Sequence, residues 1–199
     1  MSRPIPTISR RLRRPISDTL PVPIVEEQKG ELIIYYGDGE GKTSAALGHA
    51  VRSLGHGQTV RIFCFLKGRT NMGEYLHLQQ HENVTIELCG AVKFIVGKKN
   101  RDLHERLTKE CLKKVRKILH DQSCDLLILD EILYALHFNL ITTKELLDIV
   151  DARGKTHVIL TGGRKIPASL VRRAYLVTQM KKRKHEYDVQ KKTVLFIDY

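Results

Sequence analysis

The chain has 199 residues, a length that fits one domain of ordinary size. Hydrophobic residues make up 42% and charged residues 28%, which is typical of a soluble globular protein, and no apolar run reaches the length of a membrane span. The net charge of +12 admits nucleic acid, an acidic surface or a polyanionic small ligand as partner. Aromatic residues are only 6% with no Trp, which disfavours a base-stacking platform and so makes nucleic acid the weaker choice.

The N-terminal 29 residues differ in composition from the rest. Five of the six prolines fall within the first 23 residues, and residues 1–15 hold five arginines and no acid. Proline interrupts helices and removes a backbone donor, so we expect residues 1–29 to form a flexible basic arm. The arm also resembles a transit peptide, but its prolines disfavour the amphipathic helix that import requires.

The four cysteines are Cys64, Cys89, Cys111 and Cys124. None forms a C-x-x-C pair, and no secretory apolar segment precedes them. This usage predicts reduced thiols that act as small packing residues in a cytoplasmic protein.

From residue 31 onward, apolar runs alternate with helical patterns. In chain order we expect a strand at 31–36, a helix at 43–55, a strand at 59–67, a short helix at 72–81 and a strand at 84–90. There follow a helix at 102–120, a strand at 125–131, a helix at about 143–151, a strand at 156–162, a helical turn at 167–173, and strands at 175–180 and 193–199. The pattern predicts one α/β domain over 30–199, with a mostly parallel sheet covered by helices on both faces.

The helix expected at 102–120 has an apolar residue every four positions. Leu103, Leu107, Cys111, Val115 and Leu119 form this series, and lysines and arginines lie between them. We expect an amphipathic helix that packs this stripe on the sheet.

The stretch GDGEGKTS follows the first expected strand and leads into the first expected helix. Its glycines are Gly37, Gly39 and Gly41, and Lys42, Thr43 and Ser44 complete it. The usual phosphate-loop pattern, G-x-x-x-x-G-K-[ST], would need a glycine where Tyr36 stands. The physics survives this mismatch, because glycines let backbone N–H groups approach an anion and a helix N-terminus attracts negative charge. The stretch predicts a nucleotide-binding loop of a P-loop fold.

An acidic pair follows the apolar run LLIL. Asp130 and Glu131 end this expected strand, and in phosphate-loop proteins an acid at such a position handles Mg²⁺. A nucleoside triphosphate with Mg²⁺ is therefore the predicted ligand, with Thr43, Asp130 and Glu131 as candidates on the metal side.

These motifs together resemble the P-loop class of ATP:cob(I)alamin (corrinoid) adenosyltransferases. That family runs G-x-G-K-G-K-T-T-A-A-x-G, and this chain runs GDGEGKTSAALG, followed by FCFLKG, LLILDE, HVILTGGRKIP and VTQM. The resemblance extends over about residues 30 to 199. It implies a RecA-like P-loop fold in which ATP is held reversed relative to most P-loop enzymes.

The resemblance also implies the reaction and its participants. Co(I) of a reduced corrinoid attacks the 5′ carbon of ATP, and the whole triphosphate leaves. Lys42, Thr43 and Glu131 would do the catalytic work, Arg52 would help to place the nucleoside, and Phe94 would lie against the corrin. A flavodoxin-like electron donor and a homodimer are further implied, with no role for a membrane.

The chain departs from the family pattern at several positions. Glu40 replaces a loop lysine, Asp38 stands where asparagine is common, and Gly163 occupies a slot where arginine is usual. Three alternatives therefore stay open: another P-loop hydrolase or kinase, a non-catalytic protein that binds a corrinoid or nucleotide, and nucleic-acid binding through the basic segments.

Overall fold

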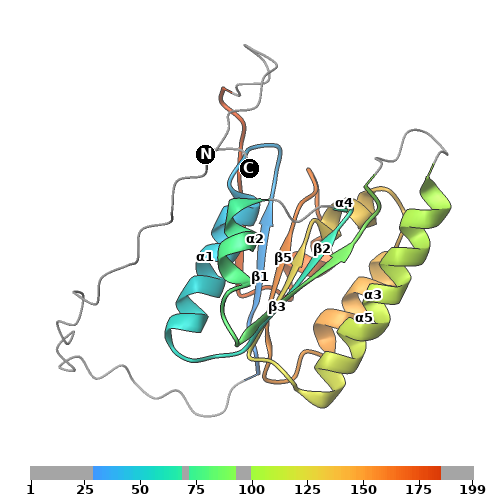
Figure 1. The fold of residues 1–199 in the computed structure, drawn as a ribbon. Coiled ribbons are helices and arrows are strands. Elements are labelled where there is room, and N and C mark those ends of the chain that lie inside the picture. The colour runs from blue at the N-terminus through green and yellow to red at the C-terminus, as the bar shows by residue number, and fades with distance from the viewer. Residues whose placement is uncertain (1–28, 69–71, 93–99, 185–199) are drawn as a thin grey trace, which may run out of the picture.

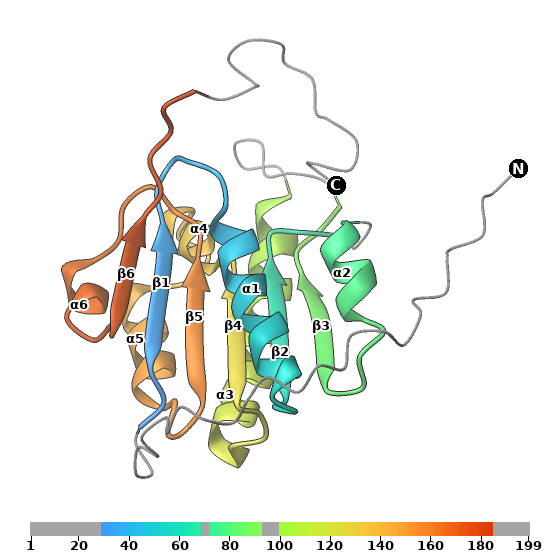
Figure 2. The same ribbon diagram turned by 90° about the vertical axis from the view of Figure 1, so that its left-hand side faces the viewer.

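The computed structural model describes residues 29–68, 72–92 and 100–184. In this part of the chain, six parallel strands form one sheet in the order β3-β2-β4-β5-β1-β6 (Figure 2). The strands are β1 Leu32–Tyr36, β2 Val60–Phe65, β3 Val84–Cys89, β4 Leu126–Asp130, β5 His157–Thr161 and β6 Leu176–Gln179. The helices are α1 Lys42–Gly55, α2 Gly73–Leu78, α3 Arg101–Asp121, α4 Ile132–His137, α5 Thr143–Asp151 and α6 Ala168–Val171.

Helices cover both faces of the sheet, as the alternating pattern predicted. α1 and α2 lie on one face, and α3, α4 and α5 lie on the other (Figure 1). Side chains of a strand point alternately to the two faces, so β4 contributes Leu126 and Ile128 to the core beneath α1 and Leu127 and Leu129 to the core beneath α3. Strands buried on both faces read as continuous apolar runs, which is how the sequence revealed them.

The central part of the chain differs from expectation in two helices. In α3, Leu103 is exposed, whereas His104 and Thr108 are buried with Cys111, Val115 and Leu119. A stripe that repeats every four residues drifts around a helix of 3.6 residues per turn, so the N-terminal half of α3 turns the expected stripe away from the sheet. The short helix α4 was not predicted, because six mostly apolar residues soon after a strand are too few to show a helical period.

The prediction of four reduced thiols is wrong for two of them. Cys89 at the end of β3 and Cys111 in α3 form a disulfide, with 5.9 Å between their Cα atoms. Cys64 and Cys124 are buried free thiols, and burial raises the pKa of Cys64 to about 12. The 22 residues that separate the disulfide partners in sequence gave no sign that the helix returns across the edge of the sheet.

Three expected features fall outside the described residues. They are the N-terminal arm apart from Lys29, the strand at 193–199, and Phe94. Among the described residues, no helix has both the length and the apolar character that crossing a membrane requires.

Candidate functional site

The candidate site lies where the carboxyl ends of four parallel strands meet. β5 lies between β1 and β4, and β2 lies on the other side of β4. Parallel strands end at the same edge of a sheet, and ligands of open α/β sheets bind there. The topology therefore brings the loop after β1, the last residues of β4 and β5, and the chain beyond β2 to one place.

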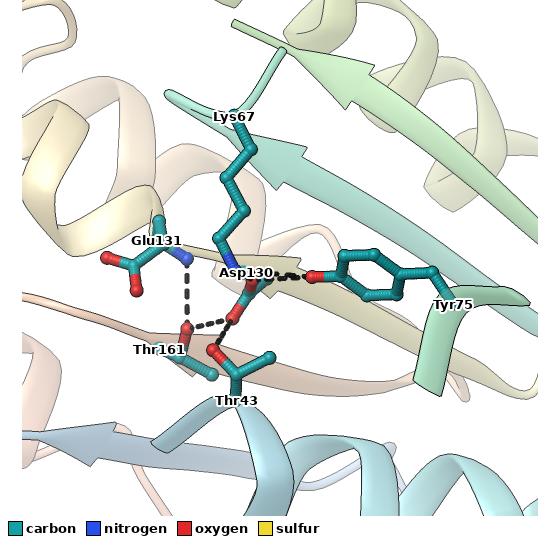
Figure 3. Close-up of polar contacts among 6 residues, drawn as sticks. All are labelled: Thr43, Lys67, Tyr75, Asp130, Glu131 and Thr161. Carbon is teal, nitrogen blue, oxygen red and sulfur yellow. Dashed lines mark hydrogen bonds and ion pairs between the residues drawn. The ribbon is translucent and has the colours of Figure 1, made fainter. Parts of the chain in front are cut away.

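Asp130, the last residue of β4, lies at the centre of a hydrogen-bond network in this site. Its side chain is fully buried, and it accepts hydrogen bonds from Thr43 Oγ1 at 2.9 Å and Thr161 Oγ1 at 2.6 Å through Oδ1 (Figure 3). Its other oxygen, Oδ2, accepts from Lys67 Nζ at 2.7 Å and Tyr75 OH at 3.1 Å. Burying a carboxylate is costly unless it is paired, and here four donors from four elements compensate it.

The environment of Asp130 raises the pKa values of Lys67 and Tyr75, so both groups stay protonated. Burial alone would lower the pKa of the Lys67 ammonium, but the charge of Asp130 and the hydrogen bond to it raise that pKa above its usual value. Burial, and then the charge of Asp130, also raises the pKa of the Tyr75 hydroxyl. Both groups therefore remain donors throughout the physiological pH range.

Glu131 has a different environment from its neighbour. Its backbone lies in the left-handed region with φ 62°, and its N–H donates to Thr161 Oγ1 at 2.9 Å. Its carboxylate points away from Asp130 (Figure 3) and toward Gly162. A Cβ added to Gly162 would lie 3.0 Å from Glu131 Oε2. Burial, followed by the charge of Asp130, raises the pKa of Glu131 to about 7. A strained backbone together with a raised carboxyl pKa is typical of a functional position.

The loop 37–41 is braced by the residues that follow β5 and by the chain that follows β6. Gly39 N–H donates to the Met180 carbonyl at 2.9 Å, and Gly37 N–H donates to the Gly163 carbonyl at 2.8 Å. These two amides are therefore engaged within the protein, which corrects the expectation that the amides of all three glycines turn toward a ligand. A Cβ on Gly37 would lie 2.1 Å from the Met180 oxygen, so glycine is needed here for the close approach of two backbones.

The remaining part of the loop leads into α1 and keeps its anion-binding character. The first four N–H groups of a helix have no acceptor within that helix, and here they come from Gly41, Lys42, Thr43 and Ser44. The Lys42 ammonium donates to the Gly39 carbonyl at 2.5 Å, which holds a full positive charge across the loop. The N-terminus of α1 therefore offers fewer amides than expected, but backbone N–H groups and an ammonium at a helix N-terminus are groups of the kind that bind phosphate.

The two loop acids lie on the surface. The Lys182 N–H donates to Asp38 Oδ1 at 3.2 Å, and this hydrogen bond is the largest cause that lowers the pKa of Asp38. Asp38 thus fastens the loop to the segment after β6. Glu40 is exposed at the loop. Neither acid is buried in the glycine turn.

Replacement of Gly37 by alanine is expected to destabilise the protein by roughly 3 kcal/mol or more, because its φ of 119° and the 2.1 Å approach to Met180 both oppose a side chain. Gly48, inside α1, has no atom within 4 Å of an added Cβ and is the matched control. Gly48→Ala is expected to stabilise by about 0.5–1 kcal/mol. Urea denaturation measures both effects, and equal effects of the two substitutions would contradict the described bracing.

Of two further predicted site residues, one lies away from this place and the other is outside the described residues. Arg52 lies in the last turn of α1 and is exposed, about 15 Å along the helix axis from Lys42 at a rise of about 1.5 Å per residue. Phe94 is not among the described residues. Ser44, by contrast, lies in the first turn of α1 beside Thr43.

Lys67, Tyr75 and Thr161 belong to the site but were missed in the sequence. A lysine after the apolar run FCFL and a threonine after HVIL are polar residues at the functional edge, and this was the available signal. Tyr75 gave no signal, because an aromatic residue on a short helix usually serves only the core.

The donor set fits magnesium shared with a phosphate ligand. The Thr43 hydroxyl and the Glu131 carboxylate are oxygen donors of the kind that Mg²⁺ prefers. Among the described residues no three His, Cys, Asp or Glu side chains are grouped to hold a metal. Mg²⁺ commonly keeps waters and takes substrate phosphates together with one or two protein oxygens, so this sparse set is suitable for it.

Comparison with known proteins points to one family. The family model described as "ATP:corrinoid adenosyltransferase BtuR/CobO/CobP" matches residues 28–199. The chain is 29% identical to the corrinoid adenosyltransferase of Escherichia coli K12 over 174 residues, which is 87% of this chain and 88% of that protein. It is also 29% identical to the corrinoid adenosyltransferase CobA of Salmonella typhimurium over the same length, and to that of Pseudomonas aeruginosa over 164 residues, 81% of this chain and 79% of that protein.

A solved structure supports the fold independently. The flagellar accessory protein FlaH from Methanocaldococcus jannaschii is similar with a TM-score of 0.51 and 17% identity, over 76% of this chain and 71% of that one. At this identity the similarity concerns the fold alone, and it agrees with the P-loop α/β architecture predicted from the sequence.

Proposed function

This chain belongs to the ATP:corrinoid adenosyltransferase family, which transfers the adenosyl group of ATP to a corrinoid, and from that premise we propose which of its residues carry out the transfer. The supporting observation is the hydrogen bond of 2.9 Å between Thr43 and Asp130, 87 residues apart, which joins the N-terminus of α1 to the acidic strand end. With Lys42 and Glu131 beside it, this junction provides a place for a triphosphate and its metal.

In the reaction, the electron pair of Co(I) forms a bond to the 5′ carbon of ATP, and the bond from that carbon to oxygen breaks. The triphosphate leaves with the electron pair of the broken bond. Negative charge therefore grows on the leaving oxygen, and preorganised positive groups near it lower the barrier. Lys42 and the amides at the start of α1 would provide this stabilisation.

Thr43 and Glu131 would hold Mg²⁺, which when bound neutralises part of the charge on the triphosphate. Thr43 donates its proton to Asp130 Oδ1, which leaves the oxygen lone pairs of the hydroxyl for a ligand. Asp130, predicted from the sequence as a metal ligand, has both oxygens engaged in four hydrogen bonds. We therefore assign it to orienting Thr43, with Glu131 as the carboxylate toward the metal.

An anaerobic assay with chemically reduced cobalamin and Mg-ATP tests the function. We expect a light-sensitive adenosylated corrinoid and intact triphosphate in equal amounts. ADP with phosphate would instead indicate a P-loop hydrolase or kinase. Binding of both substrates without either set of products would indicate a non-catalytic relative.

The charge of Glu40 offers a further test. Glu40→Lys is expected to tighten the binding of Mg-ATP by about 3- to 10-fold, because it changes two unit charges near a polyanion in a solvent-screened position. Isothermal titration calorimetry at low salt measures this change. An unchanged or weaker affinity would show that the carboxylate points away from the phosphates or is engaged by a partner.

Two partners enter the proposal from family resemblance. A flavodoxin-like protein would supply the electron that generates Co(I), and two copies of the chain would form a homodimer. Turnover that depends on added reduced flavodoxin, and a mass near twice 22.8 kDa in light scattering, are the respective expected results.

A further inference from the structure

Lys67 places a partly buried positive charge at the candidate site. Its side chain is 22% exposed, and its ammonium lies 2.7 Å from the fully buried Asp130 carboxylate. Leu66, the preceding residue, has a left-handed backbone with φ 60°, which is rare for an apolar side chain. Strained residues of this kind concentrate where a neighbouring side chain must be aimed accurately.

We propose that Lys67 is a positioning residue for adenosyl transfer: by occupying Oδ2 of Asp130 it leaves Oδ1 to orient the Thr43 hydroxyl toward the metal of ATP. The inference rests on the proposed function, since it concerns the same nucleotide site. It assigns to Lys67 a role through Asp130, without contact with the substrate.

The two oxygens of the Asp130 carboxylate accept hydrogen bonds from different groups. Oδ2 is engaged by Lys67 and by Tyr75, whereas Oδ1 is engaged by Thr161 and Thr43. A carboxylate that lost its cation on Oδ2 would be free to rotate, and Oδ1 would then move out of line with the Thr43 hydroxyl. The Thr43 hydroxyl would then lose the acceptor that fixes its proton, and with it the direction of its lone pairs.

The ammonium of Lys67 is directed into the protein. Besides Asp130 it donates to Tyr75 OH at 3.3 Å and lies 5.6 Å from the centre of the Tyr75 ring. Tyr75 OH in turn donates to Asp130 Oδ2, so the three groups form a closed triangle (Figure 3). This arrangement distinguishes Lys67 from Lys42, which lies in the loop that leads to the phosphates.

Calorimetry of ATP binding with and without magnesium tests the role. Lys67→Met removes the charge and retains most of the stem, and it is expected to weaken Mg-ATP binding by about 10- to 100-fold, as is typical for residues that orient metal ligands. In EDTA, the affinity for ATP alone is expected to change by less than about threefold, because Lys67 acts on the metal side only. Lys114→Met is the matched control, because Lys114 forms an ion pair of 2.5 Å with Glu87 that is exposed and remote from the site.

A double variant keeps the test decisive if the single variant folds poorly. In Lys67→Met/Asp130→Asn the charges of Lys67 and Asp130 are removed together, and the introduced amide can still accept from Thr43 and donate to Tyr75. We expect the double variant to melt at a higher temperature than Lys67→Met. We also expect it to recover at least half of the loss in Mg-ATP affinity caused by Lys67→Met, measured on a logarithmic scale.

The possible outcomes separate clearly. Equal losses with and without magnesium would overturn the proposal in favour of direct phosphate contact by Lys67, and no loss, or no recovery in the double variant, would overturn it as well. If the unchanged protein itself shows no affinity for Mg-ATP, the proposed function fails along with this inference, and that failure is recognisable because it precedes any substitution.

Discussion

Replacing Lys42 with alanine is expected to lower kcat/KM for adenosyl transfer by about 10²–10³-fold, which is typical for loss of one preorganised charge-stabilising donor. The ammonium of Lys42 spans the loop and is held by the Gly39 carbonyl, so it is in place before ATP arrives. Charge grows on the triphosphate as the bond to the 5′ carbon breaks, so kcat should fall more than the affinity for ATP. Steady-state kinetics with reduced cobalamin, together with calorimetry of ATP binding, provides both numbers.

Lys144→Ala is the control for this experiment. Lys144 is exposed on α5 and pairs with Asp148 one helical turn away, so its removal should leave kcat/KM within about a factor of two. If Lys42→Ala reduced only the affinity and left kcat unchanged, Lys42 would be a ground-state phosphate ligand and the assignment to the leaving group would be wrong.

Replacing Glu131 with glutamine is expected to have two opposite effects. The magnesium-dependent part of ATP binding should be lost, because the amide is a weaker metal ligand than the carboxylate. In the absence of magnesium and nucleotide, the free energy of unfolding at pH 8 should rise by as much as about 3 kcal/mol, because the wild-type carboxyl is buried beside Asp130 and its pKa is raised from 4.5 to about 7.

The pH dependence fixes the sign of the stability effect. A carboxyl whose pKa is raised on folding binds its proton more tightly in the folded state, so wild-type stability falls as pH rises from about 4.5 through about 7. The advantage of Glu131→Gln should therefore be absent below about pH 4.5 and complete above about pH 7. Urea denaturation in EDTA at pH 5 and pH 8 measures it.

Asp151→Asn is a control of opposite sign. The hydrogen bond from Arg173 lowers the pKa of Asp151, so this substitution should destabilise the protein at pH 8, by no more than about 1 kcal/mol because the pair is on the surface. An advantage of Glu131→Gln that is equal at both pH values would show that its origin is packing and not charge.

The sequence predicted the layers of the fold well because the central strands are largely buried on both faces. LLILD and HVILT have no polar residue before their last positions apart from His157 at the start, and short apolar runs of this kind are typical of strands in a parallel sheet. The α3 stripe was less reliable. Its period of four residues agrees with a helix over two turns but not over five, and the buried His104 and Thr108 could not be recognised as core residues.

The site was predictable only where its residues are close in sequence. The loop and the first turn of α1 form one continuous motif, so Lys42 and Thr43 were found directly. The partners of Asp130 come from α1, α2, β5 and the chain after β2, at separations of 87, 55, 31 and 63 residues. Such pairings depend on strand order, which sequence periodicity does not contain.

The neighbouring acids Asp130 and Glu131 illustrate the same limit. In sequence they are equivalent candidates for the metal. In the structure, a left-handed backbone at Glu131 and a saturated hydrogen-bond shell at Asp130 give them different environments. The distinction arises from one backbone angle and from groups on distant elements.

The position of β1 in the sheet has a consequence for biosynthesis. β1 comes first among the described strands, yet its neighbours are β5 and β6, the last two (Figure 2). On the ribosome, residues 32–36 must therefore wait for an emerging segment more than 120 positions downstream before they can pair, as the register of Leu32 with Val158 requires. Affinity for nucleotide should thus arise late in translation, and a nascent chain that stops before Met180 lacks the carbonyl that binds the Gly39 amide.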